Sequence, residues 1–340
     1  MKDIRVKLDI HTPWHRHVYK IDDAISYEEL IKLQNEQEYY FYKYNCGDLC
    51  EININNQGEI FINFYHEMSE SDVRHLLAII IYFISICNGY NCKYEKNMVI
   101  DGKEKCDFMS FAKEDDCPVP LFKDIKFYEI CLEDIDSKFG DIIYELYSKD
   151  KLYILELLNN YYSSVVYKDF NGNNYFHFRN LVTNIESITN SIYEEKYKKI
   201  ENNNKNYIKD LLVKVNNLCD LALKRSDINK HVMIRRPSLD NKIKDFIDYC
   251  EHEFGLKFKK DKIFIQKVAD TRNFISHIFD NTEKVYLTNE EISDFNVSFW
   301  HLFRMVFLVH VCKINNVFVR QQFLRNSMIR MQISKEFDVL

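Results

Sequence analysis

The sequence predicts an α+β chain of two domains: a small, mostly antiparallel β domain with one helix, followed by an all-α helical bundle. Its 340 residues suffice for two domains, and a hydrophobic content of 46% suffices for two packed cores. Seven glycines and four prolines are too few for a turn-dense all-β protein. Strand-like alternation in the first third gives way to helical periodicity afterwards, which sets the order of the domains.

Strand signals fill the first part of the chain, where apolar or aromatic side chains alternate with polar ones. The expected extended segments are residues 2–10, 38–44, 51–55, 59–65 and 90–112. Asn56-Gln57-Gly58 lies between two of them and suits a hairpin turn. Residues 71–87 predict a helix that ends at Asn88-Gly89. We assign these elements to a first domain over residues 1–116.

A segment with two prolines and three acids, residues 114–120, separates the domains. Pro118 and Pro120 prevent a helix from continuing and favour extended chain. We therefore place the second domain at residues 121–340.

Helical periodicity dominates this second domain. The expected helices cover residues 144–162, 176–197, 207–223 and 239–254, a segment that begins near residue 263, and long helices after Thr288. Asn202-Asn203-Asn204 interrupts the pattern and indicates a break or loop. Ser238 suits an N-cap, Gly255 suits a helix stop, and Thr288-Asn289-Glu290-Glu291 is a capping-box pattern.

Composition and charge exclude several classes of protein. The net charge is −6, and the acidity lies in residues 1–120, which hold 13 basic and 21 acidic residues. The N-terminus lacks the apolar run of a signal peptide, and the longest apolar stretch, residues 76–87, is too short to span a bilayer. Ten cysteines without a CxxC pair suit free thiols in a reducing compartment. We expect a cytoplasmic protein without membrane contact.

No metal or other cofactor is expected. His11, His15 and His17 stand close together, but no Asp or Cys at suitable spacing completes a ligand set. Arg235-Arg236-Pro237 predicts a loop more strongly than an RNA clamp.

The segment most informative for function is Asp270–His277, in the helix that begins near residue 263. It holds Arg272 and Asn273, followed by His277 after three further residues. A cation for phosphate, an amide donor and an imidazole that titrates near neutral pH are the groups that metal-free RNA cleavage requires.

A helical wheel separates this motif from the core of the bundle. The apolar stripe consists of Phe264, Val268, Ile275 and Phe279. Asn273, His277 and Asp270 fall roughly opposite this stripe, and Arg272 falls on its flank. Three alternatives stay open for the polar face: a solvated surface, a histidine hydrogen-bonded within the bundle, or a dimer interface without chemistry.

One helix presents a single imidazole, and Arg272 and His277 diverge on the wheel by about 140°. Two facing copies of the motif would pool their side chains around one phosphate, with Phe274 packing against the partner. We therefore expect a twofold homodimer.

The motif and its surroundings resemble the HEPN ribonucleases, and in particular the ApeA-like HEPN proteins of bacterial anti-phage defence. That family carries Arg, a polar residue and His at Arg-x4–6-His spacing, which Arg272, Asn273 and His277 match. The segment Asn180–Glu186 resembles the family helix whose acidic residue lies near the motif, and Phe295–Ile314 resembles the apolar helix that follows.

The resemblance implies metal-independent cleavage of RNA by dimers, often as a toxin-like effector that stops growth of an infected cell. His277 would take the proton of a ribose 2′-OH, Arg272 would neutralise charge on the phosphorane, and Asn273 would orient His277 or bind a phosphate oxygen. Glu186 and Asp270 are supporting candidates, Glu186 by setting the tautomer of His277. The implied partners are RNA, with tRNA as one candidate, and a phage-derived trigger.

A stretch without acidic residues, Lys313–Lys335, is a candidate surface for phosphates. Its candidate RNA-binding residues are Lys313, Arg320, Arg325 and Arg330. A solvated helix face is the alternative.

Two other functional interpretations stay open. In the first, the chain is a non-catalytic HEPN module that binds a nucleotide or RNA or scaffolds a partner. In the second, it is the partner of a nucleotidyltransferase. RNA cleavage in the presence of EDTA separates the enzyme from the non-catalytic module, whereas the second of these interpretations predicts an adjacent nucleotidyltransferase gene.

Overall fold

The computed structural model of the chain contains two compact units, one of residues 1–173 and 304–330 and one of residues 174–303 and 331–340. It describes residues 1–7, 41–55, 59–89, 97–106, 108, 130, 132–135, 138–148, 154, 156–158, 160–161, 174–219, 237–277 and 284–339. The expected boundary at residues 117–120 lies outside this part of the chain and stays a prediction. The two units divide at Asn174, and residues 304–330 group with the first unit.

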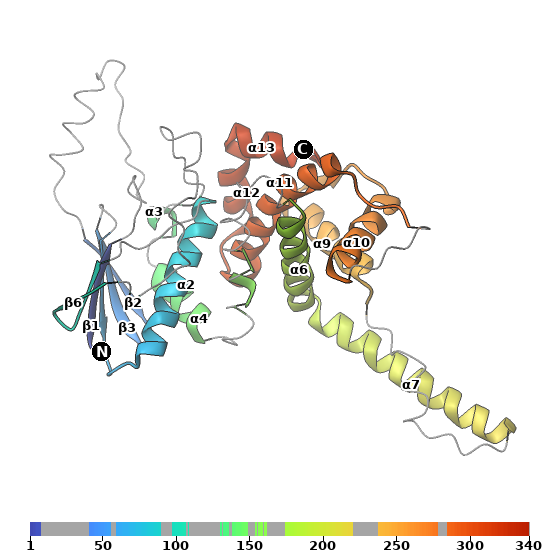
Figure 1. The fold of residues 1–340 in the computed structure, drawn as a ribbon, viewed down its shortest axis with the longest axis horizontal. Coiled ribbons are helices and arrows are strands. Elements are labelled where there is room, and N and C mark those ends of the chain that lie inside the picture. Colours follow the sequence, from blue (N-terminus) through green and yellow to red (C-terminus); the bar gives the residue numbers. More distant parts are fainter. Residues whose placement is uncertain are drawn as a thin grey trace. The chain divides into compact units, whose positions relative to one another are not determined.

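The first unit is built on a six-stranded sheet in which every pair of neighbours is antiparallel. Its strands are β1 (Asp3–Lys7), β2 (Phe41–Cys46), β3 (Cys50–Asn55), β4 (Glu59–Phe64), β5 (Asn97–Ile100) and β6 (Lys103–Cys106). They lie in the order β2-β3-β4-β1-β5-β6, and Figure 1 labels β1, β2, β3 and β6 of this sheet. Alternate residues such as Ile52, Ile60 and Ile62 are fully buried, as the period of two requires.

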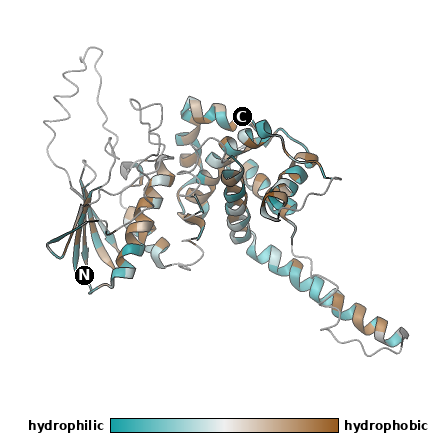
Figure 2. Ribbon diagram, viewed as in Figure 1, coloured by the Kyte–Doolittle hydropathy of each residue, from teal (hydrophilic) through white to brown (hydrophobic). Residues whose placement is uncertain are grey.

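Helix α2 (Glu70–Asn88) is the apolar helix of this unit. Ser69 caps it by accepting a hydrogen bond from the backbone N–H of Asp72 at 3.2 Å, and Gly89 ends it in the left-handed conformation with φ 69°. Leu76–Cys87 is almost entirely buried, and its apolar residues give the brown turns of α2 in Figure 2. The predicted antiparallel sheet and the helix that ends at Asn88 are confirmed.

Helix α4 (Lys138–Ser148) begins six residues before the predicted helix at 144–162 and ends at Ser148. Gly140 lies inside it because α4 packs tightly on β2, where a side-chain Cβ at this position would stand 2.2 Å from the carbonyl oxygen of Asn45. This tertiary contact explains a glycine that looks like a helix breaker in the sequence. A short helix, α3 (Leu132–Ile135), precedes α4.

Three helical segments lie in the C-terminal part of the chain: η2 (Phe307–Val311), a π-helix, α12 (Asn316–Arg325) and α13 (Ser327–Ile333). Residues 304–330 of this stretch belong to the first unit. The π-helix directly continues α11 (Asn289–Val306), so the predicted apolar helix over 295–314 is a helix with a widened last turn. Arg304 near the end of α11 is completely buried.

No helix of the described residues is both long and apolar enough to cross a bilayer.

The buried guanidinium of Arg304 closes the C-terminus of α2. Its Nε donates to the carbonyl oxygen of Ile86 at 2.7 Å and its Nη2 to that of Cys87 at 3.1 Å. These carbonyls belong to the last turn of α2, which has no intrahelical donor for them. The ring of Phe323, a residue of α12, lies with its centroid 4.8 Å from the guanidinium carbon. Gly89 leaves room for this side chain, because a Cβ there would lie 2.5 Å from Nη1 of Arg304.

The second unit is helical apart from a two-stranded antiparallel sheet. Its elements are α6 (Asn174–Ile192), α7 (Glu194–Cys219), α9 (Leu239–Phe254), β7 (Leu256–Phe258), α10 (Lys262–His277), most of α11, and β8 (Phe337–Val339). Aromatic rings form much of its core: Phe295 stacks on Phe299 with ring centroids 4.0 Å apart, and the tilted ring of Phe337 lies 5.6 Å from that of Phe299. The predicted helical C-terminal region is confirmed.

Helix α7 runs without interruption through Asn202-Asn203-Asn204, so the predicted break there is wrong. The chain instead turns at Tyr193, between α6 and α7. Helical asparagine is only mildly unfavourable, and ion pairs one turn apart, Glu194 with Lys198 and Glu201 with Lys205, support the helix on both sides.

The predicted caps of the other helices have the expected positions. The capping box of α11 is complete: Thr288 N–H donates to Glu291 at 2.8 Å, and Glu291 N–H donates to the Thr288 hydroxyl at 3.2 Å. Ser238 occupies the N-cap position of α9, but its hydroxyl accepts from the Asn241 side chain at 2.7 Å instead of from the backbone. Gly255 ends α9 with φ 60°.

We predict that Gly89→Ala destabilises the first unit much more than Gly102→Ala. Both glycines have positive φ, so alanine costs about 1–2 kcal/mol at either position. Only at Gly89 does the new methyl group meet a neighbour, the Arg304 guanidinium, and we expect roughly 2 kcal/mol more there. Urea unfolding followed by circular dichroism measures both values, and equal destabilisation would contradict the role of Arg304 as the cap of α2.

Candidate functional site

Helix α10 carries the Arg-Asn-His motif and packs against α6 and α9, which also pack on each other (Figure 1). Asp261 starts α10 by accepting from the backbone N–H of Phe264 at 3.0 Å. Phe264 and Val268 are buried, as the helical wheel predicts, and Ile275 is half-buried. The apolar stripe therefore fixes which sides of α10 can face a substrate.

Arg272 extends from α10 toward α6 and is 23% exposed. Its Nη2 lies 3.6 Å from Oε2 of Glu186, and its Nη1 donates to Oδ1 of Asn273 at 3.4 Å. Its buried Nε has no hydrogen-bond partner among the described residues. Both contacts are long for charge-assisted hydrogen bonds, so the guanidinium keeps donor capacity for an anion.

Glu186 on α6 faces a second cation, Lys242 on α9. The Lys242 ammonium donates to Oε1 of Glu186 at 2.8 Å, and only 11% of this lysine side chain is exposed. Two cations therefore share one carboxylate. These three side chains leave a net positive charge beside Asn273, which suits an anionic ligand such as a phosphodiester.

His277 is the last residue of α10 and follows Asn273 by four residues, about 6 Å along the helix axis. Asn273 is half-buried. The side chain of His277 and residues 278–283, which include Phe279, lie outside the described part of the structure. The structure thus brings Arg272, Asn273 and Glu186 together and places the backbone of His277 one turn further along.

Asp270 lies on the side of α10 opposite Val268 yet is only 8% exposed. The segment 284–288 folds back along this side of the helix. Lys284 forms an ion pair with Asp270 at 2.5 Å, and the backbone N–H of Leu287 donates to the Thr271 hydroxyl at 2.9 Å. The wheel position of Asp270 does not indicate its burial, because the wheel does not include the segment that covers this side of the helix. Asp270 anchors that segment in the structure.

Phe274 is 37% exposed and packs on Tyr286 of the same segment, with ring centroids 4.9 Å apart. Its expected contact with a second copy of the chain stays a prediction.

The four predicted RNA-binding residues belong to the first unit, whereas the motif belongs to the second. Lys313, Arg325 and Arg330 are exposed, and Arg320 on α12 is half-buried. Their contact with RNA stays a prediction.

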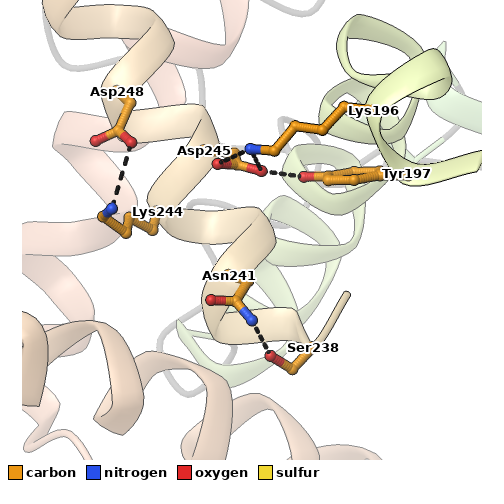
Figure 3. A network of polar contacts seen from close by, with 7 residues as sticks. All are labelled: Lys196, Tyr197, Ser238, Asn241, Lys244, Asp245 and Asp248. Carbon is orange, nitrogen blue, oxygen red and sulfur yellow. Dashed lines mark hydrogen bonds and ion pairs between the residues drawn. The ribbon is translucent and has the colours of Figure 1, made fainter. Parts of the chain in front are cut away.

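A surface cavity of about 650 Å³ lies between the start of α7 and the start of α9. Figure 3 shows its polar network: Asp245 accepts from Lys196 at 2.7 Å and from the Tyr197 hydroxyl at 2.7 Å, and Lys244 lies 3.7 Å from Asp248. Burial and the bond to Asp245 raise the pKa of Tyr197. Both lysines are paired with acids, so this cavity offers less unbalanced positive charge than the Arg272 site.

No group of three or more His, Cys, Asp or Glu that could hold a metal occurs among the described residues. His11, His15 and His17, and likewise Arg235 and Arg236, lie outside that part of the chain.

Residues 179–312 match the family model described as Apea-like HEPN. This range contains Glu186, Lys242 and the whole of α10, so the chain contains an Apea-like HEPN domain and all the residues of the site lie in it. No curated protein and no solved structure matches the chain.

Lys242 is the residue of this site that the sequence did not indicate. It lies three residues after Leu239 and four before Phe246, so it borders the apolar stripe of α9, but lysines border most amphipathic helices. Its partner Glu186 stands 56 residues earlier, and only the packing of α6 on α9 brings them together.

We predict that Thr271→Val loosens the segment 284–288, whereas Thr271→Ser does not. Valine leaves the buried N–H of Leu287 without its acceptor, which costs about 1–3 kcal/mol. Hydrogen exchange of the Leu287 amide measures the effect directly. Equal protection in the valine and serine variants would contradict the anchoring role of Thr271.

Proposed function

We propose that the Apea-like HEPN domain is a metal-independent endoribonuclease that cleaves RNA by attack of a 2′-hydroxyl on the adjacent phosphate. The observation that carries the proposal is the environment of the Arg272 side chain. Its guanidinium is held between α6 and α10 by long contacts only, next to Asn273, in a region of net positive charge one turn before His277. The match to the Apea-like HEPN family supports the assignment.

In the proposed reaction His277 accepts the proton of the ribose 2′-OH while the 2′-oxygen forms a bond to phosphorus. The bond from phosphorus to the 5′-oxygen breaks, and this oxygen takes up a proton. Arg272 donates to the non-bridging oxygens, where negative charge develops in the transition state. Asn273 orients the imidazole or binds the same phosphate. The products are a 2′,3′-cyclic phosphate and a 5′-hydroxyl end.

The proton for the leaving oxygen requires a second acid. We propose that it comes from His277 of a second copy of the chain, so that the active unit is a homodimer with two facing α10 helices. Phe274, exposed beside the motif, is a candidate contact between the copies.

We further propose that this activity serves as a toxin-like, anti-phage effector that acts in the cytoplasm, with tRNA among the candidate substrates. The acidic N-terminal part of the chain then senses a phage-derived trigger or restrains the nuclease. Excess negative charge there disfavours nonspecific RNA binding, which suits a regulatory role.

Arg272→Ala and His277→Ala are each expected to lower RNA cleavage at least about 100-fold, because each removes a group that acts in the transition state. Cleavage of labelled RNA in EDTA, with and without phage lysate, measures the loss. Lys262→Ala, at the exposed start of the same helix, is the matched control and should cleave at the wild-type rate.

Full activity of His277→Ala would contradict the site assignment. Wild-type protein that never cleaves RNA, with or without lysate, would favour the non-catalytic interpretation. Thermal unfolding of all variants ensures that a loss of activity does not reflect loss of the fold.

A further inference from the structure

The contact between Lys242 and Glu186 has a consequence for the phosphate site, given the ribonuclease proposed above. Glu186 is the acidic neighbour of Arg272, and a carboxylate that closes on an arginine forms two parallel hydrogen bonds at about 2.7–2.9 Å. In the structure the Arg272–Glu186 distance is 3.6 Å, so this close pair is not formed. The same carboxylate makes its short contact, 2.8 Å, with Lys242 instead.

Three helices contribute one charged group each to this arrangement. Glu186 belongs to α6, Lys242 to α9 and Arg272 to α10, and the side chains are 25%, 11% and 23% exposed. Lys242 is the least exposed of the three. A lysine that is largely shielded from water is unfavourable without a counter-ion, which favours its short contact with Glu186.

We propose that Lys242 is a positioning residue that keeps Glu186 from neutralising Arg272. It holds one carboxylate oxygen on the α9 side, so that the other makes only a loose ion pair with Arg272. The guanidinium thereby stays oriented by Glu186 but free to donate to a phosphodiester. Without the lysine charge, Glu186 closes on Arg272 and competes with the phosphate.

This inference rests on the proposed ribonuclease function and makes a distinctive double-mutant prediction. Lys242→Met is expected to weaken binding of RNA by about tenfold, because Glu186 then occupies the donors of Arg272. In a Glu186→Gln background the competing charge is absent, so the same lysine change should alter binding by less than about twofold. Lys242→Arg, which keeps the charge, should bind RNA like the wild type.

The experiment measures the affinity of the full chain for a fluorescent 2′-O-methyl RNA oligonucleotide of mixed sequence, which binds but cannot be cleaved. The matched control is Lys244→Met, two residues further along α9, where an exposed lysine pairs with Asp248 at 3.7 Å. The double variant Glu186→Gln with Lys242→Met removes both members of the 2.8 Å ion pair together, so neither of these two is left as an unpaired ion even if Lys242→Met alone folds poorly.

The outcomes separate the two proposals. If Arg272→Ala binds RNA as tightly as the wild type, Arg272 does not bind the ground-state phosphate and the positioning role fails, whereas the proposed function fails only if Arg272→Ala also cleaves RNA at the wild-type rate. If Arg272→Ala loses binding but Lys242→Met does not, only the positioning role fails. That role is also overturned if the effect of Lys242→Met persists in the Glu186→Gln background, because the lysine then acts without Glu186.

Discussion

A single carboxylate, that of Glu186, holds the charged centre of the helical unit together. It contacts a lysine from α9 and an arginine from α10, and all three side chains are less than one-third exposed. Opposite charges about 4 Å apart attract by about 4 kcal/mol near a protein surface, before the cost of desolvation is counted. Removing the acid would leave two cations facing each other, so the orientation of Arg272 depends on it.

The proposed role of Arg272 depends on the difference in length between the two contacts of the Glu186 carboxylate. A carboxylate that binds Lys242 at 2.8 Å and Arg272 at 3.6 Å stabilises the arginine without saturating it. The segment 284–288, bonded to Thr271 and Asp270, braces the other side of α10. A helix supported on both sides can present Arg272 and Asn273 with little conformational freedom to lose on binding, which suits the proposed phosphate site.

Local signals in the sequence predicted most of the secondary structure and the helix that carries the motif. The period of two identifies the strands around Ile52 and Ile62, and the capping box at Thr288 fixes the start of α11, because these effects act over a few residues. Tertiary contacts decided the rest. Position 140 within α4 is a glycine because α4 approaches β2 closely, and Asp270 is buried because a later segment covers it. The role of Lys242 becomes visible only through its contact with Glu186, which lies 56 residues earlier in the chain.

The most direct test of transesterification replaces one ribose at the cleaved position by 2′-deoxyribose in an otherwise identical RNA. The 2′-hydroxyl is the attacking group in the proposed reaction, so this substitution should abolish cleavage at that bond while neighbouring sites and binding stay unchanged. Mass spectrometry of the unmodified products should find 2′,3′-cyclic phosphate ends. Cleavage at the deoxy position, or products with 5′-phosphate ends, would contradict a metal-free HEPN mechanism built on Arg272 and His277.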